Sequence, residues 1–480
     1  MAHETVTAEV AIIGAGTAGM TAYRAARKYT DSVVVIESDH YGTTCARVGC
    51  MPSKLLIAAA EISHQVDNAP RFGIEVAGKQ VNGHQVMARV RSERDRFVGF
   101  VLDAVEDWPS RHKIRGRARF IAANELLVDD RIRVLAERIV IATGSSPLVP
   151  EPWSVLGDRL LINDDVFAWD RLPESIAVVG TGVIGLELGQ ALSRLGVKTH
   201  LIGAGNRFGP VTDPVINACI GKVMADELTL VPDARVEQVA RTAGGVAVSY
   251  REKDQLVTVE AACLLAATGR RPNLGGLDLQ AAGITVNDKG IPDFNDTTGQ
   301  IGSTPVFIAG DASNAHPLLH EAADDGRMAG DNAGRFPDLR VHPRRAPLSI
   351  IFTDPQIMLT GKTFASLSGS DCQFAVGEAS FEDQGRSRVL GRNKGVLRVY
   401  GEQGSGLFLG AEMFGPAAEH LGHLLAWSVQ QRLTVQQMLD SPYYHPVIEE
   451  GLRTALRGLS RRLHMGPEPV KGCLDCGPGA

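Results

Sequence analysis

Long apolar runs are missing from this 480-residue chain, although 44% of its residues are hydrophobic. No run approaches the roughly 18 apolar residues that a membrane-spanning helix requires. The first residues, MAHETVTAEVAIIG, lack the basic segment and apolar stretch of a secretory signal. We therefore expect a cytoplasmic protein without a membrane partner.

The chain also contains few cysteines and carries little net charge. A formal net charge of −6 is mild for this length, which argues against a nucleic-acid partner and against disorder. Seven cysteines do not form a disulfide framework in a chain of this size, and no metal site is expected. The length is too great for one core, so about two to four domains are expected.

Two of the cysteines, Cys45 and Cys50, lie five positions apart, followed by Pro52 and Lys54. On an ideal α-helix, Cα atoms five residues apart are about 8–9 Å from each other, whereas a disulfide needs about 7 Å or less. A bonded pair therefore requires a helix that is distorted or that begins after Cys45. Pro52 suits a first helical turn, so Cys50 is expected near a helix N-terminus, where the dipole lowers a thiol pKa. The pattern indicates a reactive dithiol, and two buried structural cysteines are the alternative.

The chain begins with a dinucleotide-binding pattern. An apolar strand at 9–13 runs into Gly14, Gly16 and Gly19, and after a helix a second apolar strand ends in Glu37. Glycines let the turn tighten and let the backbone approach a pyrophosphate, while an acid after the second strand can hydrogen-bond a ribose hydroxyl. Strand, turn, helix and acid together predict one dinucleotide site.

The same unit recurs in the middle of the chain. A strand at 175–179 leads into Gly180, Gly182 and Gly185, then a helix and a second strand. Two complete units predict two dinucleotides, and a flavin with a nicotinamide is the natural pairing beside a dithiol.

The second unit lacks the acid of the first. Glu37 lies 23 residues after Gly14, and the residue 23 after Gly180 is Gly203. An acid at this position favours NAD, and a basic residue nearby favours NADP. Arg207 is the sole charged residue nearby, and solvation also explains it, so these residues determine the nucleotide preference only weakly. The cofactor expected is NAD, with NADP as the alternative.

Three further apolar strands stop at a glycine, where a ligand can approach the backbone. Ordinary strand-to-loop turns are the alternative for the first two, whereas the carboxylate after the third has no obvious structural purpose and is a candidate ligand for flavin hydroxyls. The residues at these strand ends are Thr143 and Gly144, then Gly269 and Arg270, then Gly310 and Asp311.

A candidate acid–base pair lies near the C-terminus. Pro446 suits the first position of a helix, so His445 is expected near the N-cap, with Glu449 and Glu450 in the first turn. Acids are favoured there on structural grounds alone. A carboxylate beside an imidazole also raises its basicity and fixes its tautomer, and dithiol chemistry needs such a base.

Together these motifs resemble the flavin-dependent pyridine nucleotide–disulfide oxidoreductases, over residues 8 to 464. The order of the motifs is highly specific for this family and less specific for a substrate. The likeness is greatest to dihydrolipoyl dehydrogenases, with glutathione and mercuric reductases as relatives. It implies a glutathione-reductase-like α/β fold, with two Rossmann-like domains for FAD and NAD(P) and a C-terminal α+β dimerisation domain.

The resemblance also implies roles at matching positions. Cys50 matches the thiol beside the flavin, and Cys45 matches the interchange thiol that attacks a disulfide. Lys54 and Glu187 match an ion pair near the reactive edge of the flavin. Thr44 falls among the flavin-binding residues, although this chain has Gly-Thr-Thr-Cys where the family commonly has Gly-Gly-Thr-Cys.

Two further roles follow from the resemblance. Asp311 matches the ligand of the flavin ribitol. His445 matches the catalytic base and Glu450, not Glu449, matches its partner. In the family this histidine comes from the other subunit, which implies a homodimer.

We expect three domains and a tail. The FAD-binding domain comprises 1–150 and 277–346, the NAD(P)-binding domain 151–276, and the interface domain 347–464. A Pro- and Gly-rich tail at 465–480 is expected to be mobile.

The tail contains a Cys-x-x-Cys pair, Cys473 and Cys476. Three interpretations stay open: a second dithiol that takes electrons from Cys45 and Cys50, half of a metal site, or an exposed pair without a defined role.

The leading functional hypothesis is a dihydrolipoyl dehydrogenase that oxidises lipoyl groups on a carrier protein and passes electrons to NAD⁺. A reductase for small disulfides or mercuric ion, with the tail as an extra shuttle, is the second. A non-catalytic flavin-binding electron-carrier subunit is a third.

Overall fold

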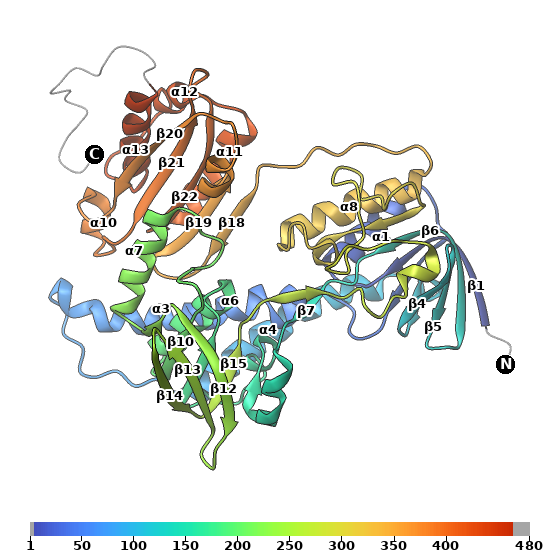
Figure 1. Ribbon diagram of the computed structural model, residues 1–480, viewed down its shortest axis with the longest axis horizontal. Helices are drawn as coiled ribbons and strands as arrows, with labels where there is room; N and C mark the ends of the chain where they lie inside the picture. Colours follow the sequence, from blue (N-terminus) through green and yellow to red (C-terminus); the bar gives the residue numbers. More distant parts are fainter. Residues whose placement is uncertain (1–3, 464–480) are drawn as a thin grey trace.

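The computed structural model describes residues 4–463 and consists of three sheet-based units (Figure 1). In the first sheet, β1 (Glu4–Ile13) lies between β2 (Val33–Glu37) and β6 (Ile132–Ile141) and is parallel to both. β17 (Val306–Ile308) comes from much later in the chain and pairs in parallel with β6. Parallel strands end at one edge of a sheet, so the glycines after β1, β6 and β17 meet there. The remaining strands are β3 (Lys113–Arg115), β4 (Ala118–Ala122) and β5 (Glu125–Val128).

Helices α1 (Thr17–Ala26) and α8 (Leu319–Arg335) lie side by side over this sheet (Figure 1). Their backbones approach closely because α8 presents glycines to α1. A Cβ atom on Gly326 would lie 2.1 Å from the Ala18 carbonyl oxygen. Helix α8, from the later part of the chain, therefore fixes the position of α1, which begins within the first glycine turn.

The second unit has a parallel sheet in the order β11-β10-β9-β15-β8. α6 (Val183–Arg194) follows β9 directly and buries Leu186 and Leu192 against the apolar side of this sheet. The strands are β8 (Leu160–Leu161), β9 (Ser175–Val179), β10 (Lys198–Ile202), β11 (Thr229–Val231) and β15 (Cys263–Ala266). α7 (Pro214–Ala225) belongs to the same unit, which is completed by an antiparallel sheet of β12 (Ala234–Arg241), β13 (Val246–Glu252) and β14 (Gln255–Ala261).

The third unit is an antiparallel sheet in the order β18-β19-β22-β21-β20. Helix α13 (Glu449–Arg462) packs on β20 and β21, and α11 (Ala418–Gln430) packs on β19 and β22. Along α13, Leu452, Leu456 and Leu459 recur at helical spacing and are buried. The strands are β18 (Leu348–Ile351), β19 (Gln356–Gly361), β20 (Phe374–Ser380), β21 (Val396–Glu402) and β22 (Phe408–Gly415).

Two long helices, α3 (Cys50–Asn68) and α4 (Gly83–Glu106), connect the first unit to the second. α3 packs against both α4 and α6, so the segment after the thiol pair touches the second nucleotide-binding unit. The short elements are α2 (Thr44–Val48), β7 (Ser145–Pro147), α5 (Asn163–Val166), β16 (Arg270–Pro272), α9 (Phe364–Ser368), α10 (Gly385–Val389) and α12 (Val435–Leu439).

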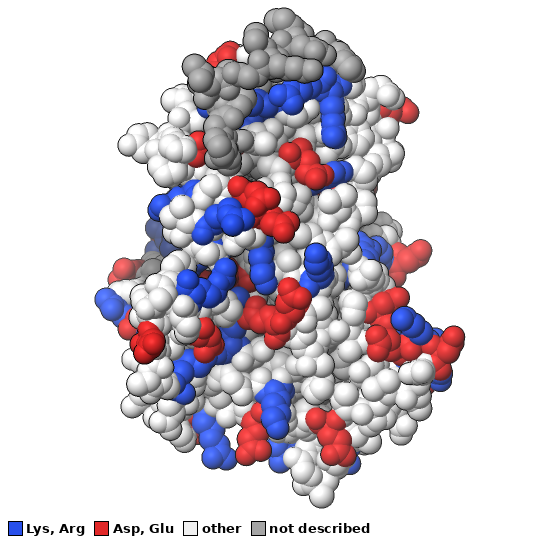
Figure 2. Space-filling view, turned by 90° about the vertical axis from the view of Figure 1, so that its left-hand side faces the viewer, with Lys and Arg blue, Asp and Glu red and all other residues white. Residues whose placement is uncertain are grey.

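The predicted fold class is confirmed: two doubly wound units and a C-terminal α+β unit are present. The domain limits given above stay predictions. Within residues 4–463, no helix is both long and apolar enough to cross a bilayer. On the face shown in Figure 2, positive and negative side chains are interspersed.

Candidate active site

A cavity of about 1260 Å³ lies at the edge of the first sheet where the parallel strands end. Gly14 has φ +104°, and a Cβ atom there would lie 2.3 Å from the Ala142 carbonyl oxygen; one on Gly19 would lie 1.9 Å from the Gly14 carbonyl oxygen. In contrast, a Cβ atom on Gly16 would meet nothing within 4 Å. The first and third glycines are therefore required by packing, and the second leaves space for a ligand.

The walls of this cavity carry polar groups that suit a dinucleotide. Glu37 lines it and uses its carboxylate to hold the glycine turn, because Oε2 accepts a hydrogen bond from the Ala15 amide at 2.7 Å. Thr143 also lines the cavity, and its buried hydroxyl has no hydrogen-bond partner among the described residues. The glycine cradle, the acid and the free hydroxyl fit FAD. Of the predicted cofactor residues, the lining includes Gly14, Gly16, Glu37, Thr44, Thr143, Gly144 and Arg270.

Two predicted cofactor residues are joined through a serine. Ser145, which lines the cavity, donates from Oγ to Oδ2 of Asp311 at 2.7 Å. Arg270 donates from Nε to Ser145 Oγ at 2.8 Å. Arg270 comes shortly after β15 of the second unit, yet antiparallel pairing of β16 with β7 brings it to the first cavity. Gly310 lies beside this group with φ +67°.

The second glycine turn repeats the packing of the first. Gly180 has φ +120°, and a Cβ atom there would lie 2.1 Å from the Ala267 carbonyl oxygen; one on Gly185 would lie 1.8 Å from the Gly180 carbonyl oxygen. Gly182 again has open space. Gly269 follows this strand end with φ +116°. The repeated geometry supports a second dinucleotide at this turn.

Residue 203, where the second unit lacks the acid of the first, has no room for a larger side chain. A Cβ atom on Gly203 would lie 2.6 Å from the side chain of Thr181, within the second glycine turn. Thr181 is held in place because its hydroxyl donates to the Arg207 carbonyl oxygen at 2.6 Å. A carboxylate at residue 203 therefore requires a smaller residue at 181.

The thiol pair lies where a short helix breaks. α2 contains Cys45 and ends at Val48, and α3 begins at Cys50. Gly49 lies between them, and its φ of −125° and ψ of −119° are not helical. The predicted helix N-terminus at Cys50 is thus confirmed, and the break brings the two thiols together. Both cysteines are free thiols that share a hydrogen bond.

The two thiols have opposite proton affinities. The hydrogen bond from Cys45, aided by the charge of Lys54 and opposed by burial, lowers the pKa of Cys50 to about 7. The same hydrogen bond, together with burial, raises the pKa of Cys45. The lowered pKa of Cys50 and the raised pKa of Cys45 therefore favour a Cys50 thiolate beside a Cys45 thiol.

Lys54 forms a close ion pair with Glu187 of α6. Its Nζ atom lies 2.8 Å from Oε2 and 3.0 Å from Oε1, and the Glu187 side chain is 5% exposed. Phe352 completes this group: its amide donates to Glu187 Oε1 at 2.9 Å, and its ring lies 4.6 Å from Lys54 Nζ. Sequence reasoning did not find Phe352, because nothing local links it to a residue 165 positions away.

The predicted acid–base pair is also in contact. His445 Nδ1 lies 2.8 Å from Glu450 Oε1, and the Val447 amide donates to Glu450 Oε2 at 3.1 Å. The prediction that Pro446 begins the helix is wrong, because α13 begins at Glu449. The Glu450 carboxylate instead closes a tight turn over 445–447, which leaves the imidazole 77% exposed. Cys473 and Cys476 lie outside the described residues.

Comparison with known proteins places this site in a family. The pyridine nucleotide-disulphide oxidoreductase model matches residues 8–326, and the dimerisation domain of that family matches residues 348–456. A mercuric reductase from Acidithiobacillus ferrooxidans is 27% identical, over 94% of this chain and 82% of its own length. A dihydrolipoyl dehydrogenase from Bacillus subtilis is 28% identical, over 93% and 97% respectively.

A further relative and a solved structure are similar to this chain over nearly its whole length. A mycothione reductase from Mycobacterium tuberculosis is 29% identical, over 94% of this chain and 99% of its own length. The crystal structure of LpdA from the same organism has the same fold, with a TM-score of 0.80 at 24% identity over 94% of this chain and 99% of that one. The chain therefore belongs to the pyridine nucleotide-disulphide oxidoreductase family, whose enzymes use FAD and NAD(P)H.

Proposed function

We propose that this chain is a dihydrolipoyl dehydrogenase: it oxidises dihydrolipoyl groups on a carrier protein and reduces NAD⁺. The observation that carries the proposal is the Cys45–Cys50 pair at the break between α2 and α3, one helical turn before the lysine of the Lys54–Glu187 ion pair. The lowered pKa of Cys50 and the raised pKa of Cys45 agree with it. The residues that line the first cavity would hold FAD, and the turn at Gly180 would hold the nicotinamide nucleotide. When bound, FAD supplies the two-electron exchange between the thiol pair and the nicotinamide.

The pKa difference between the thiols supports an order of attack. In the oxidised enzyme, a substrate thiolate attacks Sγ of Cys45, the Cys45–Cys50 bond breaks, and Cys50 leaves as a thiolate. The more acidic thiol is the better leaving group, which favours attack at Cys45 over attack at Cys50. The second substrate thiol then attacks the mixed disulfide, which releases the oxidised lipoyl group and Cys45.

His445 accepts the proton of the attacking substrate thiol in this proposal. Its exposure and its hydrogen bond to the buried Glu450 suit a base that is oriented on one side and available on the other. The match of residues 348–456 to a dimerisation domain supports delivery of this imidazole to the thiol pair of a second subunit.

A second candidate is a reductase that runs from NADPH to a disulfide or to mercuric ion. The closed position at Gly203 favours it, because no carboxylate stands there to repel the 2′-phosphate of NADP. Relatives of similar identity carry the names mercuric reductase and mycothione reductase.

Steady-state kinetics distinguish these functions. We expect the highest kcat/KM with dihydrolipoamide and NAD⁺, and loss of turnover in Cys45→Ser. Higher kcat/KM with glutathione disulfide, mycothiol disulfide or mercuric ion and NADPH would support the reductase instead. Bound FAD without any thiol-dependent turnover would indicate an electron-carrier subunit.

A further inference from the structure

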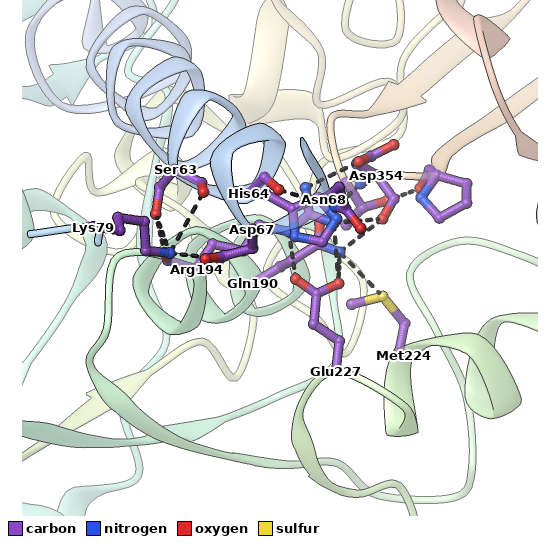
Figure 3. Close-up of polar contacts among 12 residues, drawn as sticks. Ser63, His64, Asp67, Asn68, Lys79, Gln190, Arg194, Met224, Glu227 and Asp354 are labelled. Atoms are coloured by element: carbon purple, nitrogen blue, oxygen red, sulfur yellow. Dashed lines mark hydrogen bonds and ion pairs between the residues drawn. The ribbon is translucent and has the colours of Figure 1, made fainter. Parts of the chain in front are cut away.

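A buried network lies about two helical turns beyond Glu187 on α6. Arg194 of α6 has a side chain that is 5% exposed and is held between two carboxylates. It forms a two-pronged ion pair with Glu227, with Nη2 to Oε2 at 3.0 Å, and its Nη1 lies 3.0 Å from Asp354 Oδ2. Figure 3 shows Arg194 between these carboxylates, with Lys79, Ser63 and Asp67 as a neighbouring group.

This network fixes a short segment of the third unit, residues 352–354. Gln190 accepts a hydrogen bond from the Asp354 amide at 2.8 Å and donates to the Asp354 carbonyl oxygen at 2.8 Å. Arg194 Nη2 donates to the same carbonyl oxygen at 3.1 Å. Glu187, Gln190 and Arg194 recur at helical spacing, so one face of α6 holds the whole segment.

The segment also reaches the thiol site. Phe352, two residues before Asp354, supplies the amide that binds Glu187 and the ring that lies over Lys54. Lys54 is one helical turn from Cys50 on α3, and its charge lowers the pKa of Cys50. A chain of contacts therefore leads from Arg194 to Lys54, whose charge acts on Cys50.

We propose that Arg194 is a positioning residue for the thiol site: by clamping Asp354 between α6 and Glu227, it holds Phe352 against the Lys54–Glu187 pair. Without the contacts of Arg194, Glu187 loses the hydrogen bond from the Phe352 amide, which partly offsets the negative charge of its carboxylate. The carboxylate then draws the Lys54 ammonium more strongly, and the ammonium stabilises the Cys50 thiolate less. The network acts on the reactivity of Cys50 and not only on the stability of the fold.

The test measures Cys50 directly. Reduced holoenzyme is alkylated with iodoacetamide at pH 6 to 9, and tryptic cleavage after Arg47 separates the peptide of Cys45 from that of Cys50. In Arg194→Gln we expect alkylation of Cys50 at pH 6 to slow about threefold, which corresponds to about half a pKa unit. We expect the alkylation rate of Cys50 in Arg194→Lys to lie between those of the wild type and Arg194→Gln, because an ammonium cannot reproduce the guanidinium fork.

Arg398→Gln is the matched control. Arg398 also joins the second and third units, with Nε 2.8 Å from Asp213 Oδ2 and Nη1 2.6 Å from Glu378 Oε2. We expect it to lower the Tm by a similar amount and to leave alkylation of Cys50 unchanged. If Arg194→Gln does not fold, Asp354→Asn, at a side chain that is 28% exposed, replaces it.

Two results would overturn the proposal: an unchanged pH profile of Cys50 in the network variants, or an equal shift in Arg398→Gln. The proposal rests on the assignment of Cys50 as a thiolate in the proposed function. The wild-type profile tests that assignment separately, because a Cys50 that alkylates only at alkaline pH would refute the proposed function before any variant is compared.

Discussion

The Nδ1 atom of His445 lies 2.8 Å from Oε1 of Glu450, which joins an exposed imidazole to a carboxylate that is 9% exposed. The carboxylate fixes the ring, so Nε2 is the atom that faces outward. Because general acid–base catalysis contributes about a hundredfold or more, we expect Glu450→Gln to lower kcat about tenfold and His445→Gln about a hundredfold.

The neighbouring acid provides the control for this prediction. Glu449 also lies in the first turn of α13, but among the described residues the hydrogen-bond partner of His445 Nδ1 is Glu450. Glu449→Gln should keep kcat within about twofold of wild type. An equal loss of kcat in Glu449→Gln and Glu450→Gln would mean that kcat depends on negative charge in the first turn of α13 and not on the pair with His445.

The pKa of Cys50 predicts a pH dependence for its reactivity. A pKa lowered to about 7 makes Cys50 a thiolate above pH 7 and a thiol below it. We expect iodoacetamide to react with Cys50 about tenfold more slowly at pH 6 than on the alkaline plateau. Cys45 should react more slowly than Cys50 at pH 8, because its pKa is raised.

Cys50→Ala tests the cause of this difference. The hydrogen bond with Cys50 is the largest cause of the raised pKa of Cys45. Removing the Cys50 sulfur should therefore increase alkylation of Cys45 at pH 8. Unchanged alkylation would show that burial, and not the second thiol, protects Cys45.

The sequence was informative where local chemistry determines structure. The helix start at Cys50 and the contact between His445 and Glu450 depend on residues close in the chain, and both are present. The glycine turns are also present: a local motif marks them, although they pack on Ala142 and Ala267. The helix start at Pro446 was wrong, because the Glu450 side chain captures the Val447 amide and replaces a helical turn. Their functional roles stay predictions.

Long-range contacts could not be predicted from the sequence where no family motif marks both residues, as it does for Lys54 and Glu187. Phe352 reaches Glu187 only because the third unit packs on α6, and Arg270 reaches Ser145 only because β16 pairs with β7. No periodicity or motif encodes such pairs, since tertiary packing brings them together.

Alanine substitutions at two glycines of the first turn are expected to have different effects. A Cβ atom at Gly19 would overlap the Gly14 carbonyl oxygen at 1.9 Å, whereas one at Gly16 would meet no protein atom within 4 Å. We expect Gly19→Ala to lower the Tm of the flavin-free protein. Gly16→Ala should leave that Tm unchanged and release FAD, as measured by the flavin retained on gel filtration. FAD retention in Gly16→Ala would contradict the ligand-facing assignment.

The closed position at Gly203 predicts how nucleotide preference can be changed. Gly203→Glu alone should weaken both nucleotides, because its Cβ atom would overlap Thr181 at 2.6 Å. Thr181→Gly removes this overlap and leaves the Pro232 carbonyl oxygen 3.0 Å from the Cβ atom. In the double variant we expect the ratio of kcat/KM for NADH to that for NADPH to rise at least tenfold, on the order of the cost of an unfavourable charge. Thr181→Gly alone is the control, and an unchanged ratio in the double variant would show that residue 203 does not face the ribose.

Hybrid dimers test whether His445 serves the thiol pair of the other subunit. Cys45→Ser and His445→Gln subunits with different affinity tags are co-expressed, and the mixed dimer is purified. If the imidazole comes from the partner, the mixed dimer has one complete site, made of the Cys45–Cys50 pair of one chain and the histidine of the other. We expect about half of the wild-type kcat per dimer, whereas each parent homodimer should retain about a hundredth or less. If each site used its own histidine, the mixed dimer would be as inactive as its parents, because one chain would lack the thiol and the other the base.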